Sequence, residues 1–352
     1  MAPTANTVNP AASATVQARK IFDHDGIEEW IHMGSSPEQV AAAARADGLE
    51  LVRMVCYGIP RPPVAPASCL HGAGCRPAVH AWCVKGAKLH PVRYDHREVG
   101  VWYEVGGTRR LHLGGIRPLG AAAPEVQAQE VFDALENILR QEGFTFHDVL
   151  RTWFHLDQIL DWYDAFNRVR TGFFLKVGVL GGRLPASTGV GVANLHGGAL
   201  SVDALAMAVP EKCALRVSEV TSPWQGPATA YGSSFSRAML VESPALRHLT
   251  ISGTAAIDPQ GKTMHVGDQP AQIEDTLEGV GALLEKAGFG WGDVVRAVFY
   301  TPGGTRSDLA LARLSEIGLD TSLCAVCGAD VCRDDLLFEL EVEAVREGAG
   351  GK

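Results

Sequence analysis

The chain has 352 residues, 46% of them hydrophobic, so it can bury a large core and we expect two or three domains. Its net charge of −9, with lysines and arginines scattered along the sequence, argues against a nucleic-acid-binding protein. No apolar run approaches the roughly 20 residues of a membrane-spanning helix, and the N-terminus lacks an apolar secretion signal, so we expect a cytoplasmic protein with reduced cysteines.

The first third of the chain is the least regular part of the sequence. Residues 1–20 are small and polar, and we expect them to form a disordered leader. Residues 21–96 form a divergent N-terminal region, in which Ser36 can cap a helix. Within this region we expect a helix, a strand, a loop rich in proline and glycine, and a second strand, at residues 36–46, 49–59, 59–77 and 77–86.

The middle and last thirds of the chain repeat one pattern. Residues 127–156 align without a gap on residues 272–301, and Arg151 falls on Arg296. A duplicated unit of this length indicates two copies of one small domain. We assign the first copy, a linker and the second copy to residues 97–210, 211–230 and 231–348.

Each copy reads as two strands, a long amphipathic helix, a strand, a second helix and closing strands. In the first copy Val131, Leu135 and Ile138 recur at helical spacing, and Gly143 suits the end of the helix. The predicted fold is therefore α+β, with tandem domains that are each a β-sheet with two helices on one face. We expect helices at 124–141 and 160–174 in the first copy and at 269–286 and 308–317 in the second.

This order of elements, with a Gly-Phe-x-x-x-Asp-Val turn after the long helix and a last strand of the Glu-x-Glu-Ala-Val type, resembles the RidA/YjgF family, which has a chorismate mutase-like fold. Its domains form trimers around a barrel-like core, with small-molecule sites between neighbours. Two fused copies after a divergent first third resemble the chorismatase family, on residues 185–204, 230–240 and 331–341. This resemblance implies an enzyme that acts on chorismate without a cofactor, as a homotrimer or as a monomer that imitates one, with the first third as a degenerate third layer.

Two alternative functions, those of an enamine/imine deaminase and of a zinc-binding protein, require residues that the sequence lacks. A RidA-type enamine/imine deaminase should carry an arginine two residues before a cysteine in the penultimate strand, but the sequence places Ser187 at the arginine position of the first copy and Ser322 at that of the second. The deaminase alternative therefore lacks its carboxylate anchor. Cys324 and Cys327 form a Cys-x-x-Cys pair without a second pair of zinc ligands, so we expect no metal.

Three glutamates alternate along the last strand. Glu339, Glu341 and Glu343 share one face because side chains in a strand alternate with a period of two. For Glu341 and Glu343 a solvated outer face is a plausible alternative. Alignment of the two copies sets Glu339 against Asp203, and the resemblance implies that Glu339 is the acid of the active site.

The resemblance also implies a chemical role for Cys332. Chorismate carries an enolpyruvyl ether, which becomes labile when a buried carboxylic acid protonates its terminal methylene. Cys332 lies shortly before Glu339, and in the family a cysteine near this point accompanies members that form hydroxybenzoate. We expect Cys332 to shape the pocket and exclude water. The predicted products are pyruvate and 3-hydroxybenzoate; hydrolysis to a dihydroxycyclohexadiene carboxylate is the alternative.

The two carboxylates of chorismate require cationic anchors. The candidates favoured from sequence are Arg313, which stands in an otherwise apolar segment, and Arg151. Tyr231 could bind a substrate hydroxyl, and Ser187 offers a neutral donor in place of the missing arginine. The other candidate anchors are Arg168, Arg170, Arg237 and Arg333.

Overall fold

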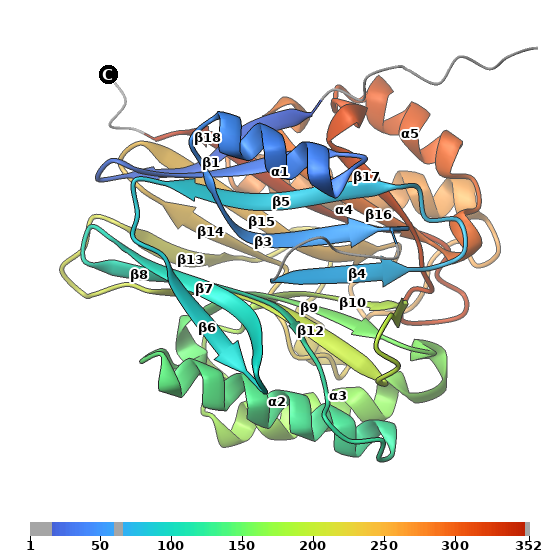
Figure 1. Ribbon diagram of the computed structural model, residues 1–352. Coiled ribbons are helices and arrows are strands. Elements are labelled where there is room, and N and C mark those ends of the chain that lie inside the picture. The colour runs from blue at the N-terminus through green and yellow to red at the C-terminus, as the bar shows by residue number, and fades with distance from the viewer. Residues whose placement is uncertain (1–15, 60–65, 349–352) are drawn as a thin grey trace, which may run out of the picture.

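A computed structural model describes residues 16–59 and 66–348. Its strands form three six-stranded sheets, which we call the N-terminal, middle and C-terminal sheets. In Figure 1 the N-terminal sheet lies at the top under its helix and the middle sheet at the bottom above two helices, with the C-terminal sheet behind them. No helix in the described part of the chain is both long and apolar enough to span a membrane.

The N-terminal sheet corrects two expectations. Strand β1 begins at Gln17, so the predicted leader ends too late, and β4 lies inside the predicted loop, where it pairs in parallel with β3. Residues 1–15 lie outside the described residues. The sheet has the order β1-β2-β5-β3-β4-β11. Its elements are β1 (Gln17–His24), β2 (Ile27–Gly34), α1 (Pro37–Ala46), β3 (Glu50–Tyr57), β4 (Ala67–His71), β5 (Ala78–Lys85) and β11 (Ala193–Asn194).

The middle sheet contains the first repeat copy and begins before it. Its order is β10-β9-β12-β8-β7-β6. Strand β6 lies before residue 97, the predicted start of the copy, but it belongs to this sheet because it pairs with β7. The elements are β6 (His90–Tyr94), β7 (Arg97–Val105), β8 (Thr108–Ile116), α2 (Pro124–Gln141), β9 (Val149–Leu156), α3 (Ile159–Lys176), β10 (Ala186–Gly191) and β12 (Leu200–Ala208).

The C-terminal sheet contains the second copy in the order β13-β14-β15-β18-β16-β17. Strand β13 lies within the predicted linker and pairs with β14. Asp268 caps α4 by accepting a hydrogen bond from the Ala271 N–H at 3.1 Å. The elements are β13 (Arg216–Val220), β14 (Ala238–Glu242), β15 (Leu246–Ala255), α4 (Gln269–Lys286), β16 (Val294–Thr301), α5 (Ser307–Glu316), β17 (Cys324–Gly328) and β18 (Glu339–Glu347).

All three sheets share one arrangement of five strands, so the first third of the chain is a third layer. The series β1-β2-β5-β3-β4 in the N-terminal sheet matches β7-β8-β12-β9-β10 and β14-β15-β18-β16-β17. The middle and C-terminal sheets each carry two helices on one face, as predicted, whereas the N-terminal sheet carries only α1 among its described residues. The opposite faces of the three sheets meet in one apolar core that includes Tyr57, Met207 and Tyr300.

Three buried arginines link the sheets around this core. These residues, Arg53, Arg151 and Arg296, occupy equivalent positions of β3, β9 and β16. A guanidinium group in the interior requires hydrogen-bond acceptors. Burial lowers the pKa of His80 well below its usual range, which keeps its ring neutral and able to accept. Each arginine donates to the neighbouring sheet: Arg53 to Asp203 at 3.3 Å, Arg151 to Glu341 at 2.8 Å, and Arg296 to His80 at 3.0 Å.

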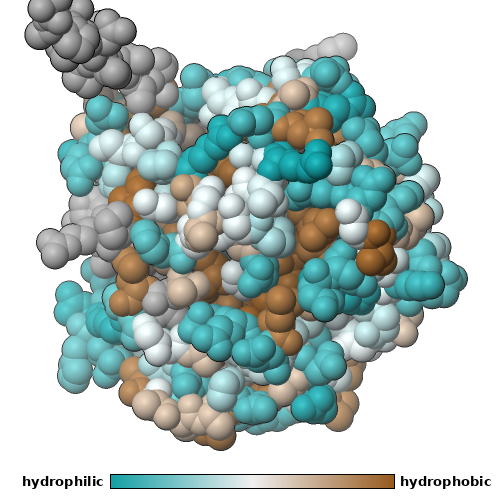
Figure 2. All heavy atoms as spheres, turned by 90° about the vertical axis from the view of Figure 1, so that its right-hand side faces the viewer, coloured by the Kyte–Doolittle hydropathy of each residue, from teal (hydrophilic) through white to brown (hydrophobic). Residues whose placement is uncertain are grey.

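The surface of the protein is mixed in character. On the face shown in Figure 2, polar side chains predominate at the periphery, and apolar atoms are visible in the hollows between them.

Candidate active site

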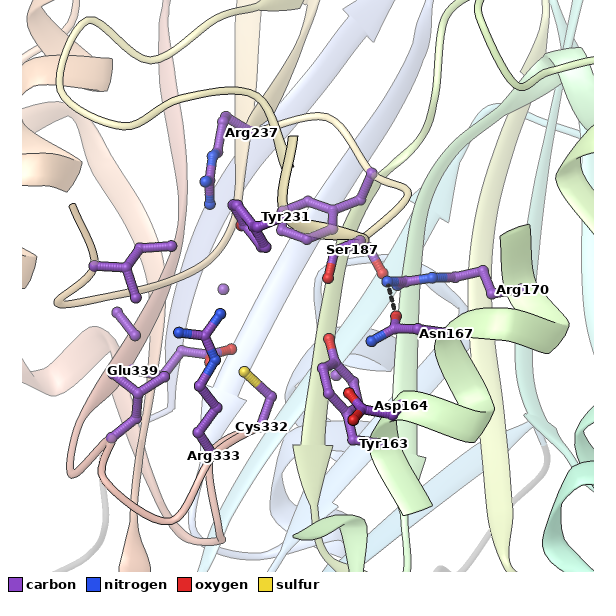
Figure 3. A pocket seen from close by; sticks show the side chains of 17 residues that line it. Tyr163, Asp164, Asn167, Arg170, Ser187, Tyr231, Arg237, Cys332, Arg333 and Glu339 are labelled. Atoms are coloured by element: carbon purple, nitrogen blue, oxygen red, sulfur yellow. Dashed lines mark hydrogen bonds between the residues drawn. The ribbon is translucent and has the colours of Figure 1, made fainter. Parts of the chain in front are cut away.

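A pocket lies between the middle and C-terminal sheets (Figure 3). Helix α3 and strand β10 supply one wall; β15, the start of β18 and the segments before β14 and β18 supply the other. The lining residues are Tyr163, Asp164, Asn167, Arg170, Ser187, Gly189, Tyr231, Ser233, Phe235, Arg237, Gly253, Ala255, Ile257, Cys332, Arg333, Leu336 and Glu339.

Glu339 reaches the pocket because β15 leaves space beside it. The pairing of β15 with β18 is irregular between Ile251 and Thr254, and Gly253 lies in this irregularity. A Cβ atom on Gly253 would lie 1.9 Å from Glu339 Oε1, closer than any packing allows. The Glu339 carboxyl group can therefore occupy this place only because residue 253 is a glycine. Glu339 is only 5% exposed.

The surroundings of Glu339 favour its protonated form. Burial is the largest influence and the charge of Glu341 the second, and together they raise the pKa of Glu339 to about 8, against the opposing effect of Arg151 and Arg237. At neutral pH the side chain is thus mainly a neutral carboxylic acid that can donate a proton. A poised acid of this kind is a common feature of catalytic sites.

Glu341 lies behind the pocket as an ionised neighbour of Glu339. Burial opposes its ionisation, but Arg296 and Arg151 outweigh burial and hold its pKa below the usual range. Its oxygens lie 2.8 Å from a guanidinium nitrogen of each arginine, and Thr188 donates a further hydrogen bond at 2.5 Å. The two carboxyl groups therefore differ in protonation because only Glu341 is paired with cations.

The alternative of a solvated face for Glu341 and Glu343 is wrong. Glu341 is fully buried and Glu343 is 3% exposed. Glu343 contacts His248 and Arg296 at 3.0 and 3.2 Å. The reason is that this face of β18 points into the closed core between the three sheets, where buried arginines supply the partners that solvent would otherwise supply.

Of the two favoured anchors, neither lines the pocket. Arg313 lies on the exposed side of α5, paired with Glu274 at 2.5 Å and with Glu316; it is Ala310 and Leu314 of this helix that are buried in the core. Arg151 is buried behind the pocket and is committed to Glu341 and Thr188. Arg151 therefore acts on the site through charge rather than through contact with a ligand.

Three other arginines line the pocket instead. Arg170 and Arg237 are 2% and 4% exposed, and Arg333 is half-buried. Arg237 donates to the Gly226 carbonyl at 2.9 Å and Arg170 to Asn167 at 2.5 Å, so hydrogen bonds hold both side chains in place. In Figure 3 Arg237 and Arg333 extend toward the interior from opposite sides. All three are among the candidate anchors named from the sequence, where Arg313 and Arg151 were favoured over them.

The remaining predicted residues, Cys332, Tyr231 and Ser187, do line the pocket. Burial, and secondarily the charge of Glu339, raise the pKa of the Cys332 thiol to about 12, which leaves it a neutral, weakly nucleophilic group. Burial also raises the pKa of Tyr231. Tyr163, which sequence reasoning missed, has its pKa raised to about 12 by burial. Both phenols are therefore neutral donors near neutral pH.

The strand register corrects the alignment of the two copies. Ser201 pairs with His155 and Glu339 with Tyr300, and His155 and Tyr300 hold equivalent places in β9 and β16. Glu339 therefore corresponds to Ser201, not to Asp203. The alignment was displaced by two residues, which leaves every side chain on the same face and so cannot be detected from a period-two pattern.

The family model described as endoribonuclease L-PSP matches residues 112–209 and 229–345, which is more than half of the chain. The chain belongs to the endoribonuclease L-PSP family. The matched segments of this family protein fall in the middle and C-terminal sheets, and the predicted α+β fold of tandem RidA/YjgF-like domains is confirmed.

Among solved structures, a chorismatase shares the fold, with a TM-score of 0.63 and 20% identity over 95% of this chain and 100% of that chain. The resemblance to the chorismatase fold is thus confirmed. A putative endoribonuclease from Thermotoga maritima is 25% identical over 37% of this chain and 98% of its own (TM-score 0.28), and the E. coli YjgF gene product 22% over the same shares (TM-score 0.28). No curated protein sequence matches the chain.

Proposed function

We propose that this family member is a chorismatase, which cleaves the enolpyruvyl ether of chorismate and releases pyruvate. The observation that carries the proposal is a carboxylic acid, Glu339, held protonated in a pocket that also presents three arginines. The shared fold with a chorismatase over 95% of the chain supports it.

The charge of the pocket suits a dianion. The pocket is lined by three guanidinium groups, those of Arg170, Arg237 and Arg333. With Glu339 protonated, the one carboxylate among the lining residues is that of Asp164, at the exposed rim. Two net positive charges remain, and chorismate carries two carboxylates. Guanidinium groups bind carboxylates through paired, directed hydrogen bonds, so the arginines would fix the substrate relative to Glu339.

The proposed reaction begins with proton transfer. Glu339 donates its proton to the terminal methylene of the enolpyruvyl group, which becomes a methyl group and leaves an oxocarbenium ion at the adjacent carbon. The carboxylate that remains on Glu339 stabilises this cation. In the route without water, the ring hydroxyl oxygen adds to the cation, its bond to the ring breaks, and it leaves as the carbonyl oxygen of pyruvate. The former ether oxygen stays on the ring as the hydroxyl of 3-hydroxybenzoate, and the proton released on aromatisation returns to Glu339. In the hydrolytic route one water adds to the cation, the bond between this carbon and the ether oxygen breaks, pyruvate and the diene diol form, and the proton of the water returns to Glu339.

The pH dependence of turnover should follow the pKa of Glu339. The protonated form is the proton donor, so activity is present below a pH of about 8 and is lost as the pH rises through that value. Initial rates of pyruvate release, measured with saturating chorismate in overlapping buffers from pH 6 to 10, test this. A rate that stayed level or increased across that range would contradict Glu339 as the acid.

Replacing Cys332 with alanine should change the product more than the rate. The thiol lines the pocket beside Glu339, and we propose that it excludes water so that the product is 3-hydroxybenzoate. Its removal opens space that water can occupy, and the diene diol should become a major product while pyruvate release stays within about tenfold of the parent protein. Chromatography of the products measures the ratio. If the product ratio of Cys332→Ala were unchanged, Cys332 would not control which product forms.

Purified protein incubated with chorismate provides the direct test of the function. Release of one pyruvate per chorismate supports the proposal, and chromatography against 3-hydroxybenzoate, 4-hydroxybenzoate and diene diol standards identifies the second product. Turnover of enamine or imine substrates without turnover of chorismate would favour the deaminase alternative.

A further inference from the structure

Away from the pocket, two cysteines from different sheets lie against each other. Cys75 lies in the connection between β4 and β5 of the N-terminal sheet, and Cys327 lies in β17 of the C-terminal sheet. Their Sγ atoms are 3.4 Å apart although the residues are 252 positions apart in the chain.

The backbone holds the two thiols together. The segment that contains Cys75 is docked on β17 by a hydrogen bond from the Arg76 N–H to the Val326 carbonyl at 3.0 Å. The Gly328 N–H donates to Cys75 Sγ at 3.2 Å. A Cβ atom on Gly328 would lie 1.7 Å from the Ala73 carbonyl oxygen, so the two segments touch backbone to backbone. The backbone packing therefore holds the two thiols in contact between the N-terminal and C-terminal sheets.

The two thiols differ in accessibility and in charge. Cys327 is fully buried, whereas Cys75 is partly exposed between the exposed residues Gly74 and Arg76. The hydrogen bond from Cys327 is the largest influence on Cys75; with the Gly72 and Gly328 N–H groups it outweighs burial and lowers the pKa of Cys75 to about 6. The same hydrogen bond, together with burial, raises the pKa of Cys327 well above its usual range.

We propose that Cys75 and Cys327 form a peroxide-sensitive modification site that closes into a disulfide between the N-terminal and C-terminal sheets. The Cys75 thiolate attacks one oxygen of a hydroperoxide, the O–O bond breaks, and Cys75 becomes a sulfenic acid while the other oxygen leaves as hydroxide or alkoxide. Cys327 then attacks the Cys75 sulfur, loses its proton and displaces hydroxide, which leaves as water. The hydroperoxide is reduced and the two thiols are oxidised.

The position of Cys327 connects this site to the pocket. Strand β17 ends at Gly328, and the chain then runs directly to Cys332 and Arg333, which line the pocket. A covalent tie at β17 would fix the segment that carries these two residues. Oxidation of this thiol pair can be tested independently of the proposed chemistry, because the test measures thiols and not turnover.

Mass spectrometry of the oxidised protein tests the proposal. The folded protein is treated with hydrogen peroxide, its free thiols are blocked, and it is digested without reduction. We expect a peptide pair linked through Cys75 and Cys327 that dithiothreitol separates. It should be absent from Cys75→Ser, and in Cys327→Ser a dimedone adduct should appear on Cys75 instead. Glutathione in the same tube serves as the control for oxidation. If Cys75 were still a free thiol after this glutathione had been oxidised, the proposal would be overturned.

A second measurement does not depend on any variant. Cys213, in the connection between the middle and C-terminal sheets, is also partly exposed and serves as the internal control. At pH 7 iodoacetamide should alkylate Cys75 at least about tenfold faster than Cys213, because the thiolate is the reacting form. Equal or slower alkylation of Cys75 would show that no reactive thiolate is present, and the proposed first step would fail.

Discussion

Replacing Glu339 with glutamine should reduce pyruvate release by a factor of about 10² to 10⁴, the usual contribution of a general acid. Glutamine has nearly the same shape but cannot deliver a proton to carbon. The parent side chain is itself mainly neutral at pH 7, since its pKa is raised to about 8. The substitution therefore introduces no change of charge into the pocket, and the thermal unfolding midpoint should remain within a few degrees of the parent value.

The chain offers a matched control for this variant. Ser201 holds the place in β12 that Glu339 holds in β18, but it does not line the pocket and contacts His155. Ser201→Ala should fold and turn over chorismate at the parent rate. If Glu339→Gln released pyruvate normally while Ser201→Ala also remained active, the proton donor would have to be sought elsewhere in the pocket.

Loss of the Arg237 guanidinium should weaken substrate capture. Arg237 is 4% exposed and lines the pocket, so a carboxylate bound to it would be shielded from water. A hydrogen bond to a charged group contributes about 1.5–3 kcal/mol, so Arg237→Met should lower kcat/KM for chorismate by about 10- to 100-fold, mainly through a higher KM. Steady-state kinetics of pyruvate release at fixed ionic strength measure the effect.

Arg313 is the natural comparison for Arg237. It carries the same charge but lies on the exposed side of α5, where its partners are Glu274 and Glu316. Arg313→Met should leave kcat and KM unchanged, because an exposed ion pair contributes little. A similar loss of kcat/KM in both variants would mean that the overall charge of the protein, and not an anchor in the pocket, controls substrate capture.

The helices were predictable because their signals are local. Helices α2 and α4 occupy residues 124–141 and 269–286, the predicted ranges, since each has a proline in its first turn, apolar residues at helical spacing and a glycine of positive φ just beyond its end. Short strands were harder to predict. Strands β4 and β13 are short, and pairing with a neighbouring strand, which a local pattern does not encode, is what makes them strands.

The position of Glu339 in the pocket could be predicted from the sequence, whereas the choice among the arginines could not. The acid stands in an alternating strand whose face is fixed by period two, and a two-residue error in alignment did not change that face. The arginines illustrate the opposite case. Arg313 stands out in its segment yet points outward, while Arg237 has an unremarkable context yet points into the pocket, because only the packing of helix on sheet and sheet on sheet decides the direction of a side chain.

The duplicated α+β unit, the long helices and the strand with three glutamates follow from the sequence alone, since repetition and periodicity are properties of the chain. Which of these glutamates is neutral depends on the packing of the three sheets. Glu339 and Glu341 are chemically identical and two positions apart. Two arginines from different sheets ionise Glu341, and burial beside that charge keeps the proton on Glu339. The difference arises from distances across the closed core, which no local pattern records.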